Sequence, residues 1–141
     1  MTGKIGVADY PISEKRPELV AGKRGKPLDE LTLEAVVAGR VSMDDLSITA
    51  NTLRLQGEIS KDSGRPTLQQ NFERAAELVD VPPDEIMRIY ELLRPGRARS
   101  KAELLDTANL LNIKYKAPRI AAFVEEAAEV YERRGLFVKR F

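Results

Sequence analysis

Residues 49–79 read TANTLRLQGEISKDSGRPTLQQNFERAAELV, and this segment carries the clearest structural signals of the chain. Thr49 suits the N-cap position of a helix because its hydroxyl accepts hydrogen bonds from free backbone N–H groups. Gly64 readily takes the left-handed conformation that ends a helix, and Pro66 fits the first position of the next one. The segment therefore predicts two helices joined by a sharp break.

Each of these two helices has an apolar face at helical spacing. On the first helix, the positions that share a face are Ile48, Thr52, Leu55 and Ile59. On the second helix, they are Leu68, Phe72, Ala75, Ala76 and Val79. Such a face usually packs against the rest of the protein. Phe72, at its centre, is therefore predicted to be a core residue.

The composition limits the chemistry that this chain can perform. The 141 residues suit one domain and include neither Cys nor His. Thiolate catalysis, imidazole metal ligands and nucleophile–His triads are therefore excluded. The formal net charge of +1 creates no overall field that would attract nucleic acid or a membrane surface. The sequence has no evident signal peptide and no apolar run near the roughly 18 residues of a membrane span, so a cytoplasmic protein is expected.

Residues 1–27 contain prolines and glycines at intervals that disfavour a helix. The segment also contains dispersed apolar residues, namely Ile5, Val7, Tyr10, Ile12, Leu19 and Val20. We expect an extended arm over residues 1–27 that docks on a partner, followed by a helical domain over residues 28–141. A loose tail is the alternative, since chain termini are often disordered.

The remaining segments predict further helices. Thr32 begins a short one with Leu33, Val36 and Val37 on its buried side, and Ser42 with Asp45 forms a capping box. Helices are also predicted over residues 83–93, 101–115 and 118–134, and Ser100 with Glu103 forms a capping box for the second of them. Their apolar faces include Ile89, Tyr90, Leu104 and Phe123, the last of which points inward or toward a partner. An apolar C-terminal tail follows, with Leu136, Phe137, Val138 and Phe141. The fold class is therefore all-α: a helical bundle of about four longer helices, with short leading helices and the extended N-terminal arm.

The sequence contains several charged clusters that could form functional sites. Basic residues at Lys23, Arg24 and Lys26 and in the loop with Arg94, Arg97 and Arg99 leave a helical nucleic-acid-binding or protein-interaction module as an alternative. The arginine loop lacks aromatic residues to stack bases, which favours a solvated loop or a rim contact to an acidic partner. The acidic residues Asp44, Asp45, Glu125, Glu126 and Glu129 fit helix-end or solvated charge. No catalytic, cofactor-binding or metal-binding residue is assigned.

A family resemblance extends over nearly the whole chain. It is carried by LRLQGEISKDSGRPTLQQNFERAAELVDVPPDEIMRIYELLRP at 53–95, with PLDELTLEAVVAGRVSMDDLSIT at 27–49 and Asp9-Tyr10-Pro11 upstream. Downstream it continues through SKAELL at 100–105 and AAFVEEAAEVYERR at 121–134. In this order the segments resemble the small (gamma) subunit of the adenosylcobalamin-dependent diol and glycerol dehydratases.

The resemblance implies a role inside a larger enzyme, a carbon–oxygen lyase that converts propanediol or glycerol to an aldehyde and water. It implies large (alpha) and medium (beta) partner subunits, in a dimer of heterotrimers. Adenosylcobalamin and a metal ion, potassium or calcium, would belong to the assembled complex and would not be bound by this chain. The small subunit would embrace the large one without supplying a catalytic residue. The resemblance also allows a reactivating factor that acts on the complex.

The N-terminus bears on localisation within that family. Members associated with bacterial microcompartments carry a longer extension before the Asp-Tyr-Pro segment, whereas here Met1–Ala8 precede it. A cytoplasmic complex is expected, and encapsulation in a microcompartment stays open. The sequence does not indicate which diol is preferred.

Overall fold

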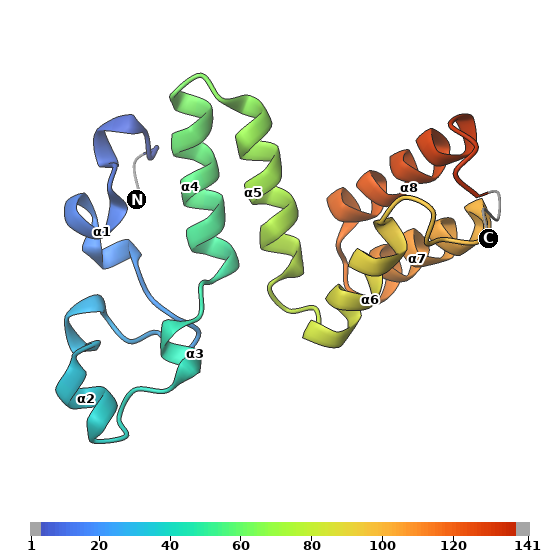
Figure 1. Ribbon diagram of the computed structural model, residues 1–141. Coiled ribbons are helices and arrows are strands. Elements are labelled where there is room, and N and C mark those ends of the chain that lie inside the picture. The colour runs from blue at the N-terminus through green and yellow to red at the C-terminus, as the bar shows by residue number, and fades with distance from the viewer. Residues whose placement is uncertain (1–3, 138–141) are drawn as a thin grey trace. The chain divides into compact units, whose positions relative to one another are not determined.

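The computed structural model describes residues 4–137. The chain forms two compact units, and the boundary between them in the sequence lies between Val79 and Asp80. Within the described residues, the regular structure consists of α-helices and short 3-10 helices, without a strand. An isolated bridge between Ala21 and Pro27 is the one pairing of extended backbone recorded there. The predicted all-α class is confirmed (Figure 1).

The first unit contains the N-terminal short helices and one hairpin of longer helices. Its elements are η1 (Val7–Asp9), α1 (Ile12–Lys15), η2 (Pro17–Leu19), η3 (Leu28–Glu30), α2 (Leu33–Val37), α3 (Met43–Leu46), α4 (Ala50–Asp62) and α5 (Pro66–Leu78). The second unit contains α6 (Pro83–Leu93), α7 (Lys101–Lys114) and α8 (Pro118–Arg133). The structure thus pairs the four longest helices within the units, α4 with α5 and α7 with α8. Their assembly into a single bundle stays a prediction.

The hairpin of α4 and α5 forms as its local signals predict. The Thr49 hydroxyl accepts a hydrogen bond from the backbone N–H of Thr52 at 3.2 Å, and Gly64 has a φ of +80°. The helices approach closely at Gly57, where an added Cβ would lie 3.3 Å from the Cβ of Phe72. Phe72 is half-buried, not the fully buried core residue that we expected, because within this unit α5 packs mainly on one neighbour, α4.

The structure corrects the expectation that residues 1–27 lack helix. The segment forms three short helical turns: η1 precedes Pro11, α1 lies between Pro11 and Pro17, and η2 begins at Pro17 (Figure 1). Ile5 and Ile12 form a buried cluster with Ile59 of α4, against which Leu19, Val20 and Leu55 pack. The chain itself therefore covers Ile5 and Ile12, whereas Val7 and Tyr10 are 48% and 64% exposed. The division of the chain into a partner-docking segment, residues 1–27, and a helical domain, residues 28–141, stays a prediction.

The second unit is built on the predicted buried faces of α7 and α8. Leu104, Ala108 and Leu111 of α7 are fully buried, as are Val124 and Ala128 of α8. The Ser100 hydroxyl accepts from the Glu103 N–H at 3.3 Å, so the predicted cap is confirmed. The Tyr131 hydroxyl of α8 donates to the Leu93 carbonyl at the end of α6. The predicted apolar C-terminal tail includes Val138 and Phe141, which lie outside the described residues.

Candidate functional site

The described residues assemble no evident centre for catalysis or metal binding. Between residues 4 and 137, no group of three or more His, Cys, Asp or Glu side chains is placed to hold a metal ion. Glu125 and Glu126 are exposed on α8, and Glu129 forms an ion pair with Lys101 at 2.8 Å. Lys101 donates hydrogen bonds to Glu129 and Glu132, and these bonds, the one to Glu129 most strongly, raise the pKa of Lys101. This cluster therefore links α7 to α8 electrostatically.

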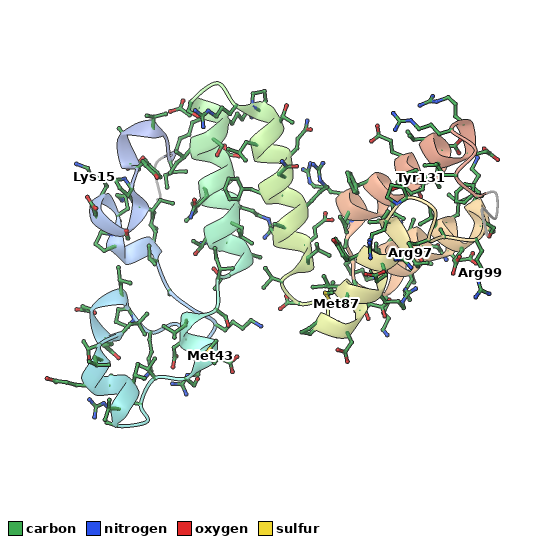
Figure 2. All side chains as sticks on the ribbon, in the orientation of Figure 1. Lys15, Met43, Met87, Arg97, Arg99 and Tyr131 are labelled. Carbon is green, nitrogen blue, oxygen red and sulfur yellow. The ribbon has the colours of Figure 1, made fainter. Side chains whose placement is uncertain are left out.

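The basic residues of the nucleic-acid alternative fall into two separate groups. Lys26 donates to the Arg40 carbonyl and Arg24 is ion-paired, so both are used inside the first unit. Arg97 and Arg99 belong to the second unit, exposed on the loop between α6 and α7 (Figure 2). The basic residues of the two units are therefore not shown to form one surface that could bind nucleic acid.

None of the helices within residues 4–137 has the length and apolar character that crossing a bilayer requires.

An ion pair between Arg24 and Asp45 fixes the segment before η3 to α3. The guanidinium donates from Nε to Oδ1 at 2.7 Å and from Nη2 to Oδ2 at 2.5 Å. The Asp45 side chain is fully buried, and its Oδ2 also accepts from the Ser42 N–H at 2.8 Å. The hydrogen bond from Arg24, more than any other contact, lowers the pKa of Asp45 to about 2. Sequence reasoning missed this pair because its partners are far apart in the chain and show no local spacing.

Close backbone packing accompanies this ion pair. A Cβ on Gly22 would lie 2.1 Å from the backbone oxygen of Asp45, so a glycine is required where the two segments cross. The next residue, Lys23, donates its N–H to the Asp44 carbonyl at 3.0 Å. Residues 22–24 are thus held to α3 by backbone contact as well as by charge.

Asp45→Asn should destabilise the first unit at neutral pH, since the variant keeps a polar side chain but loses the charge that Arg24 binds. The folded-state pKa of Asp45 lies below its ordinary value of 3.8, so its stabilising effect is present above that value. The effect should disappear as the pH falls toward 2. Urea midpoints of both proteins between pH 7 and pH 2 measure this, with the exposed neighbour in Asp44→Asn as control. A difference that does not change with pH would contradict the electrostatic account.

The short helices α2 and α3 present large apolar side chains to solvent. Leu33 is 79% exposed, Val37 81% and Met43 76% (Figure 2 marks Met43). The expectation that Leu33, Val36 and Val37 are buried is wrong: α2 is five residues long and buries only Ala35. We call the following exposed residues of these helices and of the segment after α3 the α2–α3 surface: Leu33, Val36, Val37, Met43, Leu46 and Ile48. Ile48 is 47% exposed, so its predicted place on the packed face of α4 is wrong.

The second unit exposes a smaller set of apolar residues. Met87 and Tyr90 lie on α6 and Ile113 lies on α7, each more than half exposed. Tyr90 was expected to face inward, but Ile89 takes the buried position on that helix. The prediction that Ile89 faces inward is thus confirmed, and the same prediction for Tyr90 is wrong.

Comparison with known proteins places this structure in a family. The model of the dehydratase small-subunit family matches residues 5–138. The propanediol dehydratase small subunit of Citrobacter freundii is 51% identical over 128 residues, which cover 91% of this chain and 74% of that protein. The propanediol dehydratase small subunit of Salmonella typhimurium is also 51% identical over 128 residues and is covered to 73%. The resemblance noted in the sequence is therefore confirmed, and the chain belongs to the dehydratase small-subunit family.

Proposed function

We propose that this chain is the small subunit of an adenosylcobalamin-dependent propanediol dehydratase, which converts the vicinal diol to an aldehyde and water. The observation that carries the proposal is the 51% identity with two propanediol dehydratase small subunits over 91% of the chain. Both names specify propanediol, so 1,2-propanediol is a better candidate substrate than glycerol.

The role of the chain within the complex is non-catalytic. The chain contains neither His nor Cys, so it would have no imidazole or thiolate to offer to a cofactor metal. Its described carboxylates form ion pairs or lie on exposed helix faces, not in a cluster that a metal would require. The cofactor and a potassium or calcium ion are therefore assigned to the larger subunits, and no step of the reaction is routed through this chain.

The contribution of the chain is structural. It lies against a large and a medium subunit in a dimer of heterotrimers, and it stabilises the large catalytic subunit. The outward-facing α2–α3 surface supports this assignment, since a subunit that works only in a complex needs apolar area to bury. A reactivating factor would act on the assembled complex. The complex resides in the cytoplasm, either free or in a bacterial microcompartment.

Reconstitution tests this proposal. The large and medium subunits of the Citrobacter freundii propanediol dehydratase are produced with and without this chain, and aldehyde formation from 1,2-propanediol is measured with adenosylcobalamin present. We expect the chain to co-purify with the two subunits and to restore most of the activity that is lost without a small subunit. Failure to co-purify would contradict the assignment as a subunit.

Spectral titration of the isolated chain with adenosylcobalamin tests its non-catalytic role separately. We expect no stoichiometric complex and no aldehyde from the chain alone. A stable cobalamin complex, or turnover without the other subunits, would overturn the non-catalytic role even if the chain also assembles.

A further inference from the structure

We infer that the α2–α3 surface is the principal docking surface for a larger dehydratase subunit, an inference that rests on the proposed function. This assignment differs from the sequence-based expectation, which placed docking in residues 1–27. The structure covers Ile5 and Ile12 of that segment with α4, whereas it leaves the large side chains of α2 and α3 outside.

The two short helices bury a small or charged side chain and expose their large apolar ones, which is the opposite of a usual amphipathic helix. On α2, the small side chain of Ala35 is buried while Leu33 and Val37, four residues apart and hence on one helix face, are exposed. On α3, the charged side chain of Asp45 is buried while Met43 and Leu46 are exposed. A free-standing domain would be expected to bury the larger apolar residues. This arrangement suits a protein whose apolar area is covered after assembly.

The exposed apolar area of the α2–α3 surface can be compared with that of an ordinary protein–protein interface. A fully exposed Val, Leu, Ile or Met side chain offers on the order of 60–120 Å² of removable apolar area. With exposed fractions between 47% and 81%, the six residues together offer roughly 230–460 Å². A standard interface takes about 800 Å² from each partner, a little over half of it apolar. The α2–α3 surface therefore supplies about half to all of the apolar area that one side of such an interface requires.

The surface is held in place before any partner binds. The N–H groups of Arg40 and Val41 both donate to the Ala35 carbonyl, at 2.9 and 3.3 Å, which ties the end of α2 to the segment that leads into α3. The ion pair of Arg24 with the buried Asp45 fixes α3, and Arg24 Nη2 also reaches the Arg40 carbonyl at 3.0 Å. Binding thus has to order few groups, which lowers its entropic cost.

A larger, unlike subunit is the occupant that the observations favour over a second copy of this chain. The family is defined as the small subunit of a dehydratase, so each copy needs at least one surface for a larger partner. The α2–α3 surface contains the three most exposed large apolar residues in the described chain, Val37, Leu33 and Met43. Exposed charges of both signs, Glu34, Arg40 and Asp44, lie in the same segment and provide the polar rim typical of specific interfaces.

The test measures affinity for the complex of the large and medium subunits of the Citrobacter freundii propanediol dehydratase, immobilised on a biosensor. The full chain is compared with the double variant Leu33→Asp/Val37→Asp. We expect the double variant to bind at least about 30-fold more weakly, the effect of losing a pair of energetically dominant contacts. Met43→Asp/Leu46→Asp, on α3, is a second variant that should show a similar loss.

The matched control is Met87→Asp, which places the same charge on an exposed apolar residue of the second unit. It should bind within about threefold of the unmodified chain, as expected for a residue outside the interface core. Circular dichroism should show unchanged helix content in every variant, because all five substituted side chains are exposed.

The outcomes separate this inference from the proposed function. If the unmodified chain does not bind the two subunits, the proposed function fails and this inference fails with it. If it binds and both double variants bind equally well, or if Met87→Asp loses as much affinity, only the docking assignment is overturned. Size-exclusion chromatography with light scattering covers the remaining case: a dimer of the free chain that Leu33→Asp/Val37→Asp dissociates would replace the larger subunit with a second copy.

Discussion

Replacing Leu104 by Ala should lower the free energy of unfolding of the second unit by about 2–5 kcal/mol. Leu104 is fully buried on α7, the helix that packs against α8. The substitution removes buried apolar area and leaves a cavity that two packed helices close only in part. Because a domain is typically stable by only about 5–15 kcal/mol, this is a large fraction of its stability.

The measurement has to distinguish the two units, since they need not unfold in one step. Hydrogen exchange followed by mass spectrometry does so: protection should fall in α7 and α8 and change little in α4 and α5. Leu105→Ala is the matched control, with the same residue type at the next position but 39% exposed. Its cost should stay below about 1 kcal/mol. Equal losses at the two positions would contradict the assignment of Leu104 to the core.

Helix boundaries were predictable because their signals are local. Pro83 and Leu93 bound α6 as the sequence predicts, and the caps at Thr49 and Ser100 make the expected hydrogen bonds. A cap needs only a side chain and the backbone of the next turn, so the residues that form it are adjacent in the sequence. These parts of the fold therefore follow from short sequence segments.

The buried faces of short helices could not be predicted in this way. A helix of five residues such as α2 makes little more than one turn, so its sequence does not define an apolar stripe. Whether Ala35 or Leu33 faces inward depends on what packs nearby, and the structure buries Ala35. The candidate docking surface consists largely of these residues, which is why sequence reasoning did not find it.

The structure of the N-terminal segment also depends on contacts that the local sequence does not reveal, here between residues far apart in the chain. Its prolines exclude a long helix, so the pattern predicts an extended arm, although prolines also allow the helical turns of three or four residues that form here. The contact of Ile12 with the cluster at Ile59, like the pairing of Arg24 with Asp45, joins residues far apart in the chain. Neither leaves a periodic signal. Docking by residues 1–27 therefore stays a prediction, beside the docking surface that we infer at α2 and α3.

Ile12→Asp should release residues 4–20 from α4 while leaving the α4–α5 hairpin helical. Ile12 is 6% exposed and belongs to the apolar cluster with Ile5 and Ile59. A carboxylate at this position would be buried without a partner, which is costly enough that the segment separates from α4 instead. The hairpin should survive because its caps and its close contact at Gly57 involve other residues.

Trypsin cleavage after Lys15, an exposed residue at the end of α1 (Figure 2), measures this release in the isolated chain. The initial rate should rise by at least about 30-fold, because cleavage follows the population of the open form when opening and closing are fast. Ser13→Asp is the control: it puts the same charge on an exposed neighbour at a similar distance from the cleaved bond, and its rate should stay within about threefold of the unmodified chain. Equally fast cleavage of all three proteins would mean that the segment already separates freely from α4 in the unmodified chain. The extended, partner-docking arm expected from the sequence would then be the better description of residues 1–27.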